Sequence, residues 1–403
     1  MEINCKLFRH QIKAIEGCML HPFRLVYRLP GTGKTLICVE LVKKQFQIKS
    51  DSFILWLGPA NLIAQYKNVF RNMNMTFEHF DSAERKISSG ACIISNYEMF
   101  RLHLQDFLNV KWDCAICDEF HRVKSETTMI NDAIKSLRNK SKHFWAFTGT
   151  SFQNSPYEFF ELVSIVAGKN LSFACERTLQ YRSPKFSFFR NLFGRLGFRV
   201  KRLNQGPVIG VAEPEILHRL ISDYVDYVAP DDYIQECNMP AVNEHVKRVE
   251  LTPEEVVSYK NVLKSYRKNR EKSFFSDNLE DDQIETSFNN LTELRQNILR
   301  MDGKISSKII TCTQDIKSVL TDSTSRILVF SNFVKYGLEQ LAISLEDAHI
   351  KFSLYDGSTS KKERKEMLHD YFFGSIPVML LSPVGFEGLD LYGTTHIFVL
   401  DPF

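Results

Sequence analysis

The chain has 403 residues, of which 44% are hydrophobic and 25% charged, and its formal net charge is +3. These values are ordinary for a globular protein of two or three domains with a sizeable core, and the charge is too small to indicate a partner. No apolar run reaches the roughly 18 residues of a membrane span, and the N-terminus lacks a secretory pattern, so we expect an intracellular, cytoplasmic protein.

The nine cysteines are scattered singly, apart from the pair Cys114 and Cys117. This spacing is that of a metal-ligand or redox motif, but the sequence has no second pair to complete a zinc site. The pair also lies in an apolar run whose alternation would point the two sulfurs to opposite faces of a strand. We therefore predict two buried strand cysteines rather than a metal site.

The first predicted element is a helix over residues 5–20, which contains Gln11. A glutamine ahead of a phosphate loop could read an adenine edge, because its amide both donates and accepts hydrogen bonds. Taken alone, Gln11 is more typical of a solvated helix residue.

A glycine-containing loop follows the apolar stretch 23–29 and opens an apolar-periodic run, 36–42, that indicates a helix. A strand, a glycine turn and a helix start form the setting of a phosphate loop, in which backbone N–H groups face a polyphosphate. Lys34 would then reach the outer phosphates, and the Thr35 hydroxyl would ligate Mg²⁺. The full motif has Gly or Ala where this chain has Arg28, and a surface loop is the alternative. The predicted ATP-binding residues of the loop are Gly31, Thr32, Gly33, Lys34 and Thr35.

Short apolar strands then alternate with helical stretches. This alternation predicts a parallel sheet covered on both faces, with functional residues at the carboxyl ends of its strands. The predicted strands are 53–57, 91–95, 113–117 and 143–147, and the predicted helices are 61–71, 97–108 and 129–138.

Strand 113–117 runs directly into Asp118, Glu119 and His121. Beside a phosphate loop, Asp118 would hold Mg²⁺ through its water shell, and Glu119 would orient and deprotonate the attacking water. His121 could couple this site to the loop after the next strand, 148–154, whose hydroxyls and glycine could sense the γ-phosphate. The alternatives are a capping aspartate with a solvated glutamate, and a plain turn.

The phosphate loop, the Asp-Glu-x-His run and the Thr-Gly-Thr run that begins at Thr148 resemble motifs I, II and III of superfamily 2 helicases. Residues 148–154 are close to the corresponding motif of the Swi2/Snf2 translocase branch, and residues 58–66 and 95–98 resemble its motifs Ia and Ib. The resemblance implies that Gln11 reads adenine. It also implies that the nucleic-acid backbone is contacted by Pro59, Asn61, Gln65 and Asn96.

Residues 182–202 combine arginines and lysines with phenylalanines, and no acidic residue lies between Arg177 and Ala212. The cations could bind phosphates and the rings could stack on bases, which makes Arg190, Arg195 and Arg199 candidate nucleic-acid ligands. A helical lobe with a phenylalanine core and solvated arginines is an equal alternative. A faint resemblance to the helical bridge of Snf2-like proteins resumes from about residue 239.

A second alternation of strands and helices begins near residue 326. Strands are predicted at 327–331, 352–355, 378–382 and 396–400, with helices at 336–345 and 361–373. Residues 329–333 resemble motif IV of the same family, residues 356–359 resemble a motif just before V, and residues 382–391 resemble motif V. This implies nucleic-acid contacts by Ser331, Asn332, Gly357 and Ser382, and ATP contacts by Gly388 and Asp390.

One departure from the family concerns motif VI, whose arginines reach the γ-phosphate from the second domain. The sequence ends at Phe403, just before that motif would follow. We expect that the chain continues in the natural protein; the alternative is that the arginine, which is worth several orders of magnitude in rate, comes from elsewhere.

The sequence therefore predicts an α/β protein with two RecA-like parallel-sheet motor domains in tandem and a helical, basic-aromatic insertion between them. The expected ranges are 1–165, 166–300 and 301–403. The implied function is ATP- and Mg²⁺-dependent movement on duplex, forked or branched DNA by a monomer, as in bacterial or phage recombination, repair or fork remodelling. The alternatives are the motor subunit of a DNA defence or restriction system, an RNA helicase, and an ATP-gated switch with low turnover.

Overall fold

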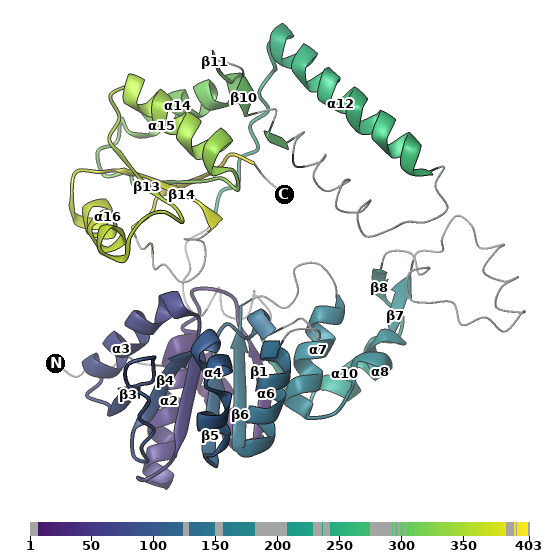
Figure 1. The fold of residues 1–403 in the computed structure, drawn as a ribbon, viewed down its shortest axis with the longest axis vertical. Helices are drawn as coiled ribbons and strands as arrows, with labels where there is room; N and C mark the ends of the chain where they lie inside the picture. The colour runs from purple at the N-terminus through teal and green to yellow at the C-terminus, as the bar shows by residue number, and fades with distance from the viewer. Residues whose placement is uncertain are drawn as a thin grey trace, which may run out of the picture. The chain divides into compact units, whose positions relative to one another are not determined.

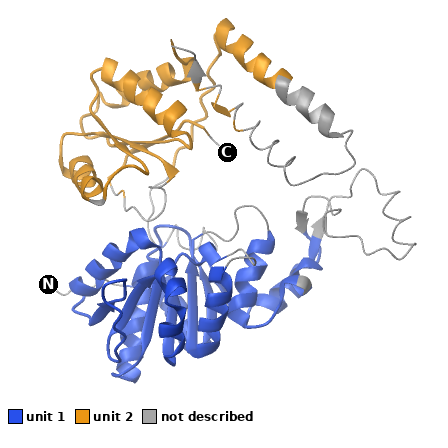
Figure 2. Cartoon of the chain, viewed as in Figure 1, with its two compact units in different colours: residues 1–241 blue, residues 242–403 orange. Residues whose placement is uncertain are grey.

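The computed structural model describes residues 7–123, 129–149, 156–181, 208–228, 236, 242–274, 292, 295–296, 299–301, 304–383, 391 and 393–401. The chain divides into two compact units, residues 1–241 and 242–403 (Figure 2). None of the helices in these described parts is long and apolar enough to cross a membrane.

The first unit is built on a parallel sheet with the strand order β3-β4-β2-β5-β6-β1-β9 (Figure 1). Its central strands are buried on both faces, which is why their sequences are continuously apolar rather than alternating. The strands are β1 (Phe23–Tyr27), β2 (Ile54–Gly58), β3 (Phe77–His79), β4 (Cys92–Asn96), β5 (Trp112–Cys117), β6 (Ser141–Thr148) and β9 (Val225–Tyr227).

Helices cover both faces of this sheet and form a separate apolar core on each. Cys114 packs in one core and Cys117 in the other, and both thiols are fully buried, so the predicted opposite orientation of the two sulfurs is confirmed. One face is covered by α1 (Arg9–Leu20), α2 (Lys34–Ile48), η1 (Ala60–Leu62) and α3 (Ile63–Asn72). The other is covered by α4 (Tyr97–Leu102), α5 (Leu104–Leu108), η2 (Phe120–Val123), α6 (Met129–Lys140) and α7 (Pro156–Ala167).

Among the described residues, four further elements of this unit come between α7 and β9. Strands β7 and β8 pair in an antiparallel ribbon. Leu217, Leu220 and Ile221 of the helix that precedes β9 are partly buried against the core of α4 to α7. The four elements are α8 (Ser172–Glu176), β7 (Leu179–Tyr181), β8 (Val208–Val211) and α10 (Pro214–Ile221).

The second unit contains a parallel sheet with the order β13-β14-β12-β15. Helices α14 and α15 supply the core on one face, and α16 packs on the other. The sheet strands are β12 (Ile327–Phe330), β13 (Phe352–Tyr355), β14 (Val378–Leu381) and β15 (His396–Val399). The remaining elements are α12 (Pro253–Phe274), the hairpin β10 (Arg300–Met301) and β11 (Lys304–Ile305), α14 (Ser307–Val319), the π-helix η4 (Val334–Leu338), α15 (Glu339–Asp347) and α16 (Lys361–Phe373).

Two parallel sheets covered by helices confirm the predicted fold class. The predicted helix 97–108 is two helices that meet at His103, and the helix predicted over 5–20 begins at Arg9. Strands β3 and β9 were not predicted, because each is only three residues long and contains a charged residue. The basic-aromatic segment 182–202 lies outside the described residues.

One buried carboxylate joins two helices of the second unit. Glu255, in the first turn of α12, accepts hydrogen bonds from the Thr252 N–H at 2.6 Å and from the Ser307 N–H and hydroxyl at 2.7 Å each. Partial burial disfavours the charge, but these donors outweigh it and lower the pKa of Glu255. The carboxylate therefore caps both α12 and the start of α14.

We predict that Glu255→Ala destabilises the second unit by about 2 kcal/mol, because three donors lose their acceptor. The neighbouring Glu254→Ala is the control, since Glu254 is exposed and pairs with the equally exposed Lys304 at 2.7 Å. Urea unfolding followed by circular dichroism measures both variants. Equal midpoints for the two would contradict the capping role.

Candidate nucleotide-binding site

The loop between β1 and α2 has the backbone of a phosphate cradle. Gly31 and Gly33 adopt φ angles of 80° and 78°, in the left-handed region that favours glycine. Gly33 is the N-cap of α2, and Lys34 is its first residue. The loop thus leads into the N-terminus of a 15-residue helix, where the N–H groups and the helix dipole attract anions.

Helix α1 supports this loop from one side. The Gln11 amide nitrogen donates to the Thr32 carbonyl at 3.1 Å, and its oxygen accepts from the Phe8 N–H at 2.9 Å. A Cβ on Gly33 would come within 2.4 Å of the Gln11 amide nitrogen, so this close approach requires glycine. Gln11 is buried against the loop rather than solvated, and its reading of adenine stays a prediction.

Asp118 and Glu119 follow β5 beside the loop. The Lys34 ammonium lies 3.8 Å from Glu119 Oε1, which brings the predicted phosphate ligand next to the predicted base. Glu119 has a φ of 49°, a strained conformation for a residue with a side chain and one that is typical of functional sites. The sequence-predicted pairing of these two motifs is therefore present in the fold.

The Asp118 carboxylate is buried, and burial raises its pKa to about 6. The adjacent Glu119 adds to the rise, while a hydrogen bond from the Tyr66 hydroxyl and the charge of Lys34 oppose it. Its two oxygens accept from the Tyr66 hydroxyl at 2.8 Å and the Glu119 N–H at 2.9 Å. A buried carboxylate beside a second one has a strong electrostatic demand for a cation, and its oxygens suit Mg²⁺. Together with the Thr35 hydroxyl on α2, this donor set fits the predicted metal.

Two tyrosines position the Asp118 residue. Tyr66 reaches its carboxylate from α3, and Tyr97 reaches its main-chain carbonyl from α4 at 2.7 Å. The Tyr66 ring passes over Gly58, where a Cβ would lie 2.5 Å from the Tyr66 hydroxyl. The glycine that ends β2 is therefore needed for the tyrosine to reach the site.

His121 connects the ends of β5 and β6. Its Nδ1 lies 3.3 Å from Glu119 Oε2 and 3.3 Å from the Thr148 hydroxyl. At Gly149, a Cβ would approach the Lys34 ammonium to 2.9 Å. The contact predicted between His121 and the next strand is present, and its coupling role stays a prediction. Residues 150–154 of the same loop lie outside the described residues.

Arg28, which departs from the usual phosphate-loop motif, has a local explanation. Its side chain is fully buried, and its guanidinium donates to the Asp226 carboxylate at 2.9 Å and to the Asp226 carbonyl at 3.0 Å. Asp226 belongs to β9, which pairs with β1 along the same stretch. The arginine thus ties the strand that precedes the phosphate loop to the edge of the sheet.

The residues predicted to contact nucleic acid in the first unit lie at the carboxyl ends of β2 and β4. Asn61 is exposed, Gln65 is half-buried and Pro59 is buried. The Asn96 side chain accepts from the Met99 N–H at 2.8 Å and caps α4. Asn96 therefore has a structural role, and the nucleic-acid contacts stay predictions.

The corresponding residues of the second unit lie at the ends of its own strands. Asn332 donates to the Asp401 carboxylate through its main chain, at 3.0 Å, and through its side chain, at 2.8 Å. Ser331 is buried, Gly357 is exposed, and Ser382 is buried with no hydrogen-bond partner for its hydroxyl in the described structure. Gly388 and Asp390 lie outside the described residues, as do Arg190, Arg195 and Arg199.

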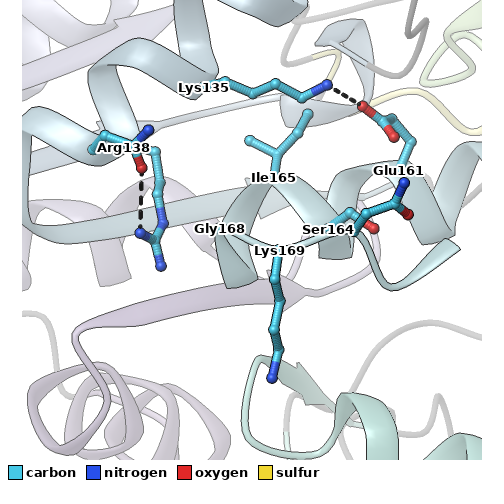
Figure 3. A pocket seen from close by; sticks show the side chains of 9 residues that line it. Lys135, Arg138, Glu161, Ser164, Ile165, Gly168 and Lys169 are labelled. Atoms are coloured by element: carbon cyan, nitrogen blue, oxygen red, sulfur yellow. Dashed lines mark hydrogen bonds and ion pairs between the residues drawn. The ribbon is translucent and has the colours of Figure 1, made fainter. Parts of the chain in front are cut away.

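A separate hollow of about 440 Å³ lies between α6 and the end of α7 (Figure 3). Two of its cations have partners within the first unit. Lys135 pairs with Glu161 at 2.9 Å. The Arg138 guanidinium donates to the Val166 and Ala167 carbonyls at 3.1 and 2.9 Å. Arg138 also lies 3.8 Å from the centre of the Phe23 ring. The Arg138 bonds satisfy carbonyls at the end of α7, and the hollow lacks the glycine loop of the nucleotide site.

The residues that position the site from distant parts of the chain could not be identified from the sequence. Tyr66 lies in the stretch that resembles motif Ia, but nothing in its spacing pairs it with Asp118. Asp226 and Glu236, which contact Arg28 and His10, lie more than 190 residues from their partners. A periodicity of apolar residues carries no information about such pairs.

We predict that Tyr66→Phe weakens the apparent Mg²⁺ affinity in ATP hydrolysis about tenfold, the usual effect of removing a group that orients a metal ligand. The measurement is ATP turnover against Mg²⁺ concentration. Tyr97→Phe is the matched comparison and should shift the Mg²⁺ curve less, because that hydroxyl bonds the Asp118 main chain and not its carboxylate. Equal Mg²⁺ curves for the wild type and Tyr66→Phe would rule out this role.

Two family models together cover most of the chain. The SNF2-related domain matches residues 29–302, and the helicase conserved C-terminal domain matches residues 307–403. Among solved structures, the Sulfolobus solfataricus SWI2/SNF2 ATPase core in complex with dsDNA aligns with a TM-score of 0.47 at 20% identity, over 99% of this chain and 82% of that chain.

The chain also has curated relatives. A protein of Acanthamoeba polyphaga mimivirus, provisionally named ATP-dependent RNA helicase L538, is 24% identical over 98% of this chain and 80% of its own length. The DNA repair and recombination protein RAD54-like of Drosophila ananassae is 24% identical over 92% of this chain and 52% of its own length. The chain spans about half the length of the RAD54-like relatives. With the SNF2-related domain matched over residues 29–302, more than half of its length, the chain belongs to the SNF2-related family of ATP-hydrolysing, helicase-type nucleic-acid motors.

Proposed function

We propose that this protein is a DNA translocase that couples ATP hydrolysis to movement on duplex or branched DNA, in recombination or repair. The observation that carries the proposal is the Lys34–Glu119 pair at 3.8 Å, which joins a phosphate loop to a water-activating carboxylate. The choice of DNA is supported by the family and by the names of the RAD54-like relatives.

The chemistry assigned to the site uses residues of the first unit. Lys34 and the loop N–H groups bind the phosphates of ATP, and Glu119 accepts a proton from the attacking water. The water oxygen bonds to the γ-phosphorus while the bond to the β–γ bridging oxygen breaks, giving ADP and phosphate. Mg²⁺, held by Thr35 and Asp118, would neutralise the phosphate charge. His121 would pass the state of Glu119 to Thr148. Gly388 and Asp390 of the second unit stay proposed ATP contacts.

A second candidate, an RNA helicase, is favoured by the provisional name of the mimivirus relative. The two functions share the same ATP site and differ in the polymer that stimulates it. ATPase measurements with matched DNA and RNA therefore separate them, and an ATP-gated switch would show little stimulation by either.

We predict that duplex, forked or four-way-junction DNA stimulates ATP turnover at least several-fold more than RNA of the same length. Stimulation by RNA alone would contradict the choice of DNA and support the second candidate.

We predict that Glu119→Gln lowers kcat by about 100-fold while ATP still binds, because the substitution removes the base. Lys34→Ala should abolish both ATP binding and turnover.

We also propose that the basic-aromatic segment 182–202 contacts the phosphate backbone. Replacing Arg190, Arg195 and Arg199 with Ala should weaken DNA binding and reduce the slope of log K against log salt by roughly 2 to 3, for three lost phosphate contacts. A fluorescence-anisotropy salt titration measures this slope. The control variant replaces Lys111 and Lys140, which are exposed and lie at the amino ends of β5 and β6. An unchanged slope in the arginine variant would exclude the segment from the interface.

A further inference from the structure

Helix α1 is capped by a residue from a distant part of the chain. Its N-cap is Phe8, which makes no side-chain capping bond, and its first turn has no acidic residue. The Glu236 carboxylate supplies the missing acceptor: it bonds the Arg9 N–H and, at 3.2 Å, the His10 N–H. A carboxylate at this place accepts from two N–H groups of the first helical turn and faces the positive end of the helix dipole.

His10 extends this contact to the phosphate loop. Its Nδ1 lies 3.0 Å from Glu236 Oε2, and its Nε2 lies 3.3 Å from the Thr32 carbonyl. Both neighbouring atoms are acceptor oxygens, so each ring nitrogen of His10 faces an acceptor. Partial burial opposes the charge on Glu236, but the bonds from His10 and the two N–H groups outweigh it and lower the pKa of Glu236. The buried His10 ring thus bridges a charged carboxylate and the loop.

The orientation of the Thr32 carbonyl determines the orientation of the Gly33 N–H, which follows it in the loop. In a trans peptide the C=O and the following N–H point in opposite directions. Bonds from His10 and Gln11 hold the Thr32 carbonyl toward α1. The Gly33 N–H, in the same peptide unit, is therefore aimed away from α1, as an anion cradle built from loop N–H groups requires.

We propose that Glu236 and His10 are positioning residues that act through the Thr32 carbonyl to aim the Gly33 N–H at the phosphates of ATP. This inference rests on the proposed nucleotide site. Glu236 lies close to the end of the first compact unit, and the second begins at Val242. ATP affinity therefore depends on a residue that lies 226 positions along the chain from His10.

The test compares Glu236→Gln, His10→Ala and the double variant in the full chain. Each is measured for the ATP dissociation constant with a fluorescent ATP analogue, for kcat and KM, and for thermal stability. Glu236→Gln keeps one acceptor oxygen for the Arg9 N–H, but it loses the second oxygen and the charge that face His10. We expect each single variant to weaken ATP binding about fivefold, as for part of one charge-assisted hydrogen bond, with kcat changed less than twofold.

The double variant should bind ATP no more weakly than His10→Ala, because both residues act through one contact. Glu213→Gln is the matched control, since Glu213 is an exposed N-cap of α10 that makes no capping bond. Wild-type ATP affinity in Glu236→Gln, a lower melting temperature without weaker binding, or fully additive effects would each overturn the inference. If the wild type itself bound no ATP, the proposed nucleotide site would fail instead.

Discussion

The buried carboxylate of Asp118 is the constraint on which the site depends. It stands at the end of a strand that is buried on both faces, where water cannot solvate its charge. The fold compensates with a tyrosine hydroxyl, a main-chain N–H and a nearby lysine ammonium. These groups come from different parts of the fold, so the packing of helices around the sheet is what stabilises the buried carboxylate. Gly58 and Gly149 leave the space through which Tyr66 and Lys34 reach it.

The phosphate loop shows a similar dependence on distant groups. Arg28 begins the loop with a buried charge, and Asp226 neutralises it from the next strand. A buried pair of this kind adds little net stability, but removal of one partner leaves an unpaired charge that costs about 3–5 kcal/mol. A buried arginine is therefore tolerated at a position that normally holds a small residue because β9 lies beside β1. Arg28 and Asp226 are best regarded as one unit.

Much of this organisation could be predicted from the sequence. Long apolar strands, the glycines of the phosphate loop and the acidic pair after β5 identify themselves, because local sequence determines them and parallel sheets gather strand ends at one edge. Helix α16 has the predicted bounds, residues 361–373. The contacts of Tyr66, Asp226 and Glu236 could not be predicted, because they depend on tertiary packing between residues far apart in the chain. The same holds for β9, three residues whose strand conformation comes from pairing with β1.

The place of β9 has a consequence for synthesis of the protein on the ribosome. Arg28 and Asp226 are separated by 198 positions, so at about 5–20 residues per second the partner emerges on the order of ten to forty seconds after the arginine. During that interval the nascent sheet has β1 as its open edge, with an unpaired row of N–H and C=O groups and a solvated guanidinium. The nucleotide site can thus be completed only after nearly the whole first unit has been made. A chain cut short before residue 225 would contain every phosphate-loop residue and still lack the strand that holds them in place.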